Sequence, residues 1–214
     1  MPATGIEALH RDHEIETLLL GEFGKVQSLM EDKDYLFSRI ALECAPTLQC
    51  LKPSTLLCFP RCGRNLRSLW EKYKNRTKQE LGLDYFEVTS SANHHSVIFF
   101  RYDILAETLR SGKNIAFMRE SGYRGPTSVE AVLAYLQEKM GRRYPHEIGL
   151  LLGIPAEDIR GFIANQGARC LLCGYWKVYH DPQHAGAIFK AYDNAKKAIM
   201  RSIIEFHSPL PAPV

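Results

Sequence analysis

A short apolar run near the middle of the chain decides the fold: Val97-Ile98-Phe99-Phe100-Arg101-Tyr102. It is rich in aromatic and β-branched residues, which favour a strand, and its first four residues do not alternate with polar ones. A strand that exposes one face to water alternates, whereas a strand covered on both faces does not. We therefore expect a central strand with helices packed on both sides of it.

Three further segments have the composition of short strands. They are Thr55 to Phe59, Tyr85 to Thr89 and Tyr175 to Tyr179. The polar stretch from Ser90 to His95 joins the second of them to the central run, which predicts an antiparallel hairpin with a long loop. We expect His94 and His95, at the end of that stretch, to be solvated.

Apolar residues spaced three and four apart predict the helices. The apolar stripes are Phe37, Ile40, Ala41 and Cys44, closed by Pro46; Leu66, Leu69, Trp70 and Tyr73; Val129, Val132, Leu133, Leu136 and Met140; and Ala185 through Ile203. Thr127 and Glu130 have the spacing of a capping box before the third stripe. The first thirty residues are expected to be helical too, with Ile15, Leu18, Leu19 and Phe23 facing inward. Two short helices, 146–152 and 156–165, are expected on either side of Gly153-Ile154-Pro155.

Together these elements predict a single α+β domain over residues 1–207. It would contain a small mixed or antiparallel sheet of about four strands wrapped by about seven helices. The tail 208–214 has three prolines in seven residues and is expected to be disordered.

The composition excludes several classes of protein. A chain of 214 residues with 45% hydrophobic and 10% aromatic content can fill a core, which excludes intrinsic disorder as its main state. No apolar run approaches the roughly 18 residues needed to cross a bilayer, and we see no export signal. We therefore expect a cytoplasmic protein with no membrane partner. The net charge of +3 is too small to indicate a polyanion partner by itself.

Two sequence blocks resemble a known family. The first is Cys44-Ala45-Pro46-Thr47-Leu48 with Lys52-Pro53, and the second is His146-Glu147-Ile148-Gly149-Leu150-Leu151-Leu152-Gly153-Ile154-Pro155, followed by Asp158, Gly161-Phe162-Ile163 and Gly174-Tyr175-Trp176-Lys177-Val178-Tyr179. In this order they are similar to the uncharacterised bacterial family catalogued as domain of unknown function 3793. The resemblance covers about residues 40 to 195, within a core of 30–200. It implies a cytosolic bacterial protein, and it implies no activity, cofactor or catalytic residue.

Two pairs of cysteines have the spacing of metal-binding knuckles. They are Cys58 with Cys62 and Cys170 with Cys173, and a glycine follows each pair. In a knuckle, a tight turn aims two sulfurs at one metal, and the glycine relieves the crowded turn. Two such pairs can form one tetrahedral zinc or iron site. The alternative is that these thiols pack in the core, because cysteine is among the most buried residue types.

The second cysteine pair is also a candidate redox dithiol. A thioredoxin-like pair opens a helix, whose N-terminus lowers the thiol pKa. Cys170 and Cys173 precede a predicted strand instead, which disfavours this alternative. In a chain with no export signal we expect all six cysteines to be reduced.

A basic segment follows the first predicted strand. Between residues 61 and 78 it carries Arg61, Arg64, Arg67, Lys72, Lys74, Arg76 and Lys78 against Glu71. We expect Arg61 and Arg64 to hold a phosphate or carboxylate near the start of the helix. The alternatives are a solvated helix face and a nucleic-acid-binding surface. For this segment the solvated helix face is favoured. Separately, the paired helices in 146–165 have the outline of a helix-turn-helix, but the second carries no net positive charge, which disfavours DNA binding there.

The remaining candidate site residues come from the family blocks. His146 begins a predicted helix, where we expect it to cap the helix. The alternative is a general base or a ligand. Lys52 and Lys177 complete the expected anion-binding set. We therefore expect an accessory or ligand-binding protein that holds a metal or a small anion near the first strand and the second cysteine pair. A small enzyme with a pocket lined by His146 and arginine is the alternative, and we favour a protein that is not an enzyme.

Overall fold

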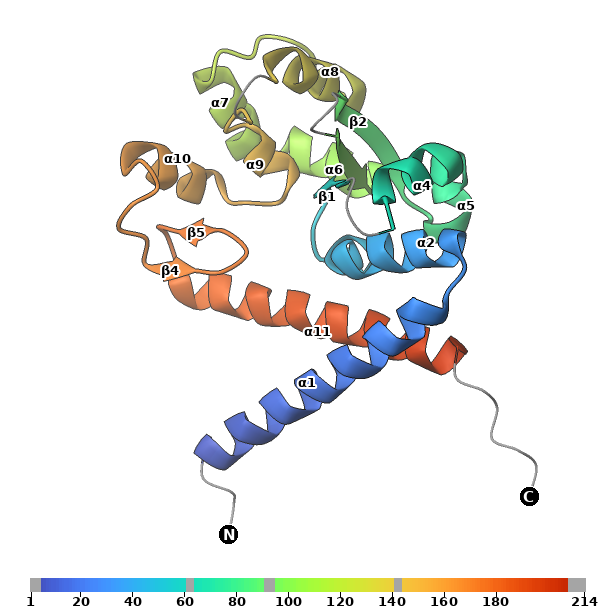
Figure 1. Ribbon diagram of the computed structural model, residues 1–214. Helices are drawn as coiled ribbons and strands as arrows, with labels where there is room; N and C mark the ends of the chain where they lie inside the picture. Colours follow the sequence, from blue (N-terminus) through green and yellow to red (C-terminus); the bar gives the residue numbers. More distant parts are fainter. Residues whose placement is uncertain (1–4, 61–63, 91–94, 141–143, 208–214) are drawn as a thin grey trace, which may run out of the picture.

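The computed structural model describes residues 5–60, 64–90, 95–140 and 144–207. Helices flank a three-stranded sheet, and a two-stranded hairpin lies to one side of this sheet. Two long helices cross below the rest of the fold in the view of Figure 1. The helices are α1 (Gly5–Leu29), α2 (Asp32–Glu43), α3 (Ala45–Leu48), α4 (Leu66–Tyr73), α5 (Thr77–Leu81), α6 (Tyr102–Arg110), α7 (Gly112–Glu120), α8 (Val129–Lys139), α9 (Ile148–Leu151), α10 (Ala156–Ala164) and α11 (Pro182–His207), with a 3-10 turn at Lys74–Arg76. The strands are β1 (Ser54–Cys58), β2 (Asp84–Ser90), β3 (His95–Phe100), β4 (Leu172–Cys173) and β5 (Lys177–Val178).

The central strand of the sheet is β3, which confirms the prediction from the apolar run. The strand order is β1, β3, β2, and both pairings are antiparallel. Val97 and Phe99 enter a core formed with α2 and α4, whereas Ile98 and Phe100 enter a second core with helices α6 to α10. All six residues of β3 are buried. Because both faces of the strand are covered, the residues from Val97 to Phe100 are all apolar and do not alternate with polar ones.

Strand β2 contains a bulge against β3. Glu87 pairs with Val97, but Thr89 pairs with Ser96, so Val88 is an extra residue on the β2 side. A bulge locally bends the strand and changes the direction of its side chains. Here Val88 enters the core with Ile98, while the Glu87 carboxylate accepts a hydrogen bond from Trp70 on α4.

The predicted long helices are present, with one local correction. Helix α2 ends before Pro46, as predicted, and Pro46 then occupies the first turn of the separate short helix α3, where a missing backbone N–H costs nothing. The N-cap of α8 is Ser128 rather than Thr127, and the Ser128 hydroxyl accepts a hydrogen bond from the amide of Ala131.

Helices α1 and α11 cross and share a small core (Figure 1). Leu19 and Phe23 on α1 pack with Met200 on α11 and Leu42 on α2. The prediction that Leu18 faces inward was wrong: it is 69% exposed, because a helix packed on one side buries only a narrow stripe. Within the described ranges, no helix combines the length and apolar character needed to span a membrane.

The fold class is α+β, as predicted, and the sheets are antiparallel. The segment from Tyr175 to Tyr179 forms only the two-residue strand β5, which pairs with β4 in a hairpin. His95 was expected in a solvated loop, but it begins β3 and is 1% exposed. Arg61, Cys62, His94 and the tail 208–214 lie outside the described residues.

Candidate functional site

A pocket of about 530 Å³ lies where the second family block meets the hairpin that follows it. Helices α9 and α10 form one side of this motif pocket, and the β4–β5 hairpin forms the other. Figure 1 shows α10 lying beside this hairpin. Its lining residues are Tyr144, Pro145, His146, Ile148, Gly149, Leu152, Ile154, Asp158, Ile159, Phe162, Tyr175, Trp176 and Lys177. Pockets of about 300–1,000 Å³ with mostly apolar walls are typical sites for small molecules.

The turn between α9 and α10 shapes the pocket and joins the two family blocks. Gly153 has a φ of +80°, in the left-handed region that favours glycine. A Cβ on Gly153 would lie 3.0 Å from Cδ of Pro53, so glycine also permits the close approach of the first block. Next to it, the Ser54 hydroxyl donates a hydrogen bond of 2.5 Å to the Leu151 carbonyl. The two blocks, about a hundred residues apart in sequence, are therefore in direct contact.

Asp158 fastens the hairpin to α10. The residue is 1% exposed, and its Oδ2 accepts a hydrogen bond of 2.7 Å from Nε1 of Trp176. Its Oδ1 accepts hydrogen bonds of 2.7 Å from the backbone amides of Tyr179 and His180. A buried carboxylate is tolerated when several donors solvate it in this way. A Cβ at Gly161 on the same helix would overlap Tyr179, so glycine lets the hairpin approach.

Lys177 supplies a positive charge at the exposed edge of the pocket. Nζ of Lys177 donates a hydrogen bond of 2.6 Å to the Gly167 carbonyl and lies 6.0 Å from the ring centre of Phe162. The ring centre of His146 lies 5.7 Å from that of Phe162. An ammonium group has three N–H donors, so Lys177 keeps donors for a ligand besides its bond to Gly167. The structure thus brings two of the predicted site residues, His146 and Lys177, to one pocket.

Lys52 packs behind the pocket rather than lining it. Its Nζ lies 5.7 Å from the ring centre of Tyr192 on α11, and that ring contacts Tyr175 at a centre distance of 5.0 Å. Burial lowers the pKa of Lys52 to about 8, although the nearby Cys44 thiol opposes this shift. Burial also raises the pKa of the Cys44 thiol well above its usual range. Cys44 is therefore an unreactive core thiol.

The structure brings Cys170 and Cys173 together but places Cys58 in a different cluster. The sulfurs of Cys170 and Cys173 lie 2.9 Å apart. Sγ of Cys58 lies 3.3 Å from the Ser96 hydroxyl and 3.7 Å from the Tyr144 hydroxyl. Across the described ranges, no group of three metal-binding side chains within 4.8 Å of one another contains a cysteine. Cys58 therefore does not join Cys170 and Cys173 in such a group, and the predicted partner Cys62 lies outside the described residues.

Much of the basic segment is engaged with local acceptors. The Arg64 guanidinium donates to the carbonyls of Met30 and Ser28 at 2.7 and 2.8 Å, which ties it to the end of α1. Lys78 pairs with Asp84 at 2.7 Å. Lys74 pairs with two glutamates, at 2.8 and 2.9 Å. These pairings reduce the positive charge available to a phosphate backbone.

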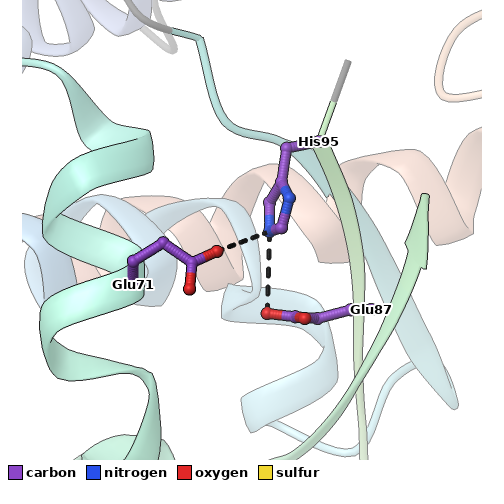
Figure 2. Close-up of side chains that lie close together, drawn as sticks. All are labelled: Glu71, Glu87 and His95. Atoms are coloured by element: carbon purple, nitrogen blue, oxygen red, sulfur yellow. Dashed lines mark ion pairs between the residues drawn. The ribbon is translucent and has the colours of Figure 1, made fainter. Parts of the chain in front are cut away.

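A second cluster of titratable side chains lies beside the sheet: Glu71 from α4, Glu87 from β2 and His95 from β3 (Figure 2). Nε2 of His95 lies 3.9 Å from Oε1 of Glu71 and 3.7 Å from Oε1 of Glu87. Burial lowers the pKa of His95 and outweighs the two carboxylates, which raise it. Burial alone would raise the pKa of Glu87, but hydrogen bonds from Lys74 and Trp70 bring it below its usual value.

Sequence reasoning missed this cluster because it assigned His95 to a polar loop. One signal was present: positions 95, 97 and 99 fall on one face of a strand, and Val97 and Phe99 are buried. Extending the strand back by two residues would have predicted a buried histidine. The positions of Glu71 and Glu87 depend on the packing of α4 against the sheet, which no local pattern reveals.

Comparison with known proteins gives one family. A sequence model of the family described as "Protein of unknown function (DUF3793)" matches residues 40–210. Neither the curated proteins nor the solved structures contain a significant match.

Proposed function

Because the chain belongs to the DUF3793 family, whose description assigns no activity, we propose a function from the geometry of the motif pocket. The protein binds a small molecule with an apolar body and an acidic group. The observation that carries this proposal is the exposed Lys177 ammonium at the edge of an aromatic and aliphatic pocket of about 530 Å³. The proposed setting is the bacterial cytoplasm, in keeping with the family resemblance and the free thiols.

The walls of the motif pocket favour an apolar ligand body. Ile154, Ile159, Phe162 and Trp176 contribute apolar surface, and burying such surface stabilises a complex by roughly 25 cal/mol per Å². The Trp176 ring is fixed, because Asp158 holds its Nε1 and Phe189 packs nearly perpendicular to it at a centre distance of 4.5 Å. A wall that does not rearrange on binding loses little conformational entropy.

The polar lining favours an acidic group on the ligand. Lys177 and His146 can both donate to an oxyanion. Asp158 is the carboxylate in the lining, and its two oxygens are already occupied by Trp176 and two backbone amides. An anion near Lys177 would therefore gain a charge-assisted hydrogen bond, which contributes about 1.5–3 kcal/mol.

A pair of ligands that differ only in charge tests the proposal. The fluorescent anion 8-anilinonaphthalene-1-sulfonate is bound to the protein and displaced with 2-naphthoate or with its neutral amide, 2-naphthamide. We expect naphthoate to compete about tenfold better than the amide, which corresponds to about 1.4 kcal/mol. In Lys177→Gln this preference disappears, whereas it persists in the control Lys190→Gln, which removes an exposed charge from α11. Equal competition by the acid and the amide in the unmodified protein would refute the proposal.

A further inference from the structure

We propose that Glu71, Glu87 and His95 form a binding site for a divalent transition-metal ion, separate from the motif pocket. Figure 2 shows the three side chains pointing toward one another from α4, β2 and β3. The imidazole Nε2 and one oxygen of each carboxylate all lie within 4.8 Å of one another. These are three ligand atoms of suitable types, and they come from three different elements.

The fold holds two of these ligands in place. Glu87 pairs with Val97, two residues from His95 on the same strand face, so Glu87 and His95 are diagonal neighbours across the sheet. Trp70 donates a hydrogen bond of 2.9 Å to Oε1 of Glu87. The His95 ring packs against Phe59 at a centre distance of 6.2 Å, and its side chain is 0% exposed. A ligand set fixed by its surroundings loses little freedom when a metal binds.

The third ligand gives access from solvent. The Glu71 side chain is 47% exposed, whereas that of Glu87 is 30% exposed. Three protein ligands with one open side are typical of metal sites that keep a position for water or substrate. An ion can therefore enter past Glu71 without opening the core.

The donor types and their separations fit a borderline metal. One imidazole nitrogen and two carboxylate oxygens suit Zn²⁺ or Co²⁺, with bonds of about 2.0–2.2 Å. Ligand atoms on such an ion lie about 3.0–3.5 Å apart. Nε2 of His95 is 3.7 and 3.9 Å from the two oxygens, so small side-chain rotations close the site.

Lys74 is the internal competitor for this ion. Its Nζ lies 2.8 Å from Oε2 of Glu71 and 2.9 Å from Oε1 of Glu87, so the ammonium bridges the two carboxylates. The Oε1 atom of Glu71, which faces His95, is not the oxygen nearest Lys74. A metal therefore enters between Oε1 of Glu71 and His95, and it must weaken the bond from Lys74 to Glu87. Removing the Lys74 charge should therefore increase the affinity for the metal. If the cluster were only a structural ion-pair network, this substitution would not increase the affinity.

Calorimetric titration with Zn²⁺ tests the site in the full chain. All variants are made in a parent protein that carries both Cys170→Ser and Cys173→Ser, because two thiols 2.9 Å apart would also bind zinc. We expect Glu71→Gln to weaken binding at least tenfold and Lys74→Met to strengthen it severalfold. Glu80→Gln is the matched control, because Glu80 pairs with Lys33 and Arg76 outside the cluster, and it should leave the affinity unchanged.

A second readout locates the ion. The chain has two tryptophans, and in a Trp176→Phe background the fluorescence comes from Trp70, whose Nε1 lies 2.9 Å from Oε1 of Glu87. Co²⁺ bound at the site should quench this signal, and Glu71→Gln should abolish the quenching. Circular dichroism establishes that each variant is folded. If folded Glu71→Gln binds Zn²⁺ as tightly as the parent, or Lys74→Met binds it more weakly, the inference is wrong.

Discussion

Burial changes the chemistry of Lys52, a residue of the first family block. Its pKa is about 8, whereas that of an ordinary lysine is about 10.4. The folded protein therefore loses this proton at a lower pH than the unfolded chain does. Below about pH 8 both states carry the charge, and the folded state bears the full cost of burying it. Between about pH 8 and 10.4 the unfolded chain binds the extra proton, so stability rises with pH.

Replacing Lys52 with an uncharged residue should remove the free-energy cost of burying its charge. We expect Lys52→Met to raise the free energy of unfolding by about 2 kcal/mol at pH 7, with a smaller gain at pH 9.5. Urea unfolding at the two pH values measures the difference, and Lys190→Met on the exposed side of α11 is the control. A gain of the same size at both pH values would show that the effect comes from methionine packing and not from charge.

At the scale of a single element, two neighbouring hydroxyl residues at the start of α8, Thr127 and Ser128, differ in their role: only Ser128 is the N-cap. The Ser128 hydroxyl accepts a hydrogen bond of 3.3 Å from the Ala131 amide, although Thr127 has the better capping-box spacing in the sequence. We expect Ser128→Ala to lower the free energy of unfolding by about 1 kcal/mol, because it removes a cap. Thr127→Ala should cost clearly less. Thermal unfolding of the two variants side by side decides which residue is the cap.

The elements with long, repeated patterns could be predicted, and those defined by a few residues could not. The strand β3 was visible because four consecutive apolar residues can be buried only between two layers. The bulge at Val88 and the short helix α3 left no periodic signal, since each involves too few residues.

Among the site residues, His146 and Lys177 were identified from the second of the two sequence blocks. Their meeting in one pocket depends on the Asp158 contacts, which join residues some twenty positions apart.

At the scale of the whole molecule, Asp158 links the helical body to the hairpin that precedes α11. Asp158→Ala would leave three donors without their acceptor: the buried Nε1 of Trp176 and the part-buried amides of Tyr179 and His180. We expect a loss of about 3 kcal/mol or more in the free energy of unfolding, and weaker binding in the motif pocket, because Trp176 loses its anchor. Urea unfolding measures the loss. Asp103→Asn, at a side chain that is 72% exposed, should change stability by less than about 0.5 kcal/mol.

Helix α11 packs against the hairpin at one end and against α1 at the other. Near its start, Phe189 and Tyr192 pack against Trp176, and eight residues after Tyr192, Met200 packs against α1. A continuous helix of 26 residues is about 39 Å long and behaves as a stiff rod. By simple leverage, a tilt of about 5° at the hairpin end moves the far end by about 3 Å. A tilt of α11 at its hairpin end would therefore also shift the end that packs on α1.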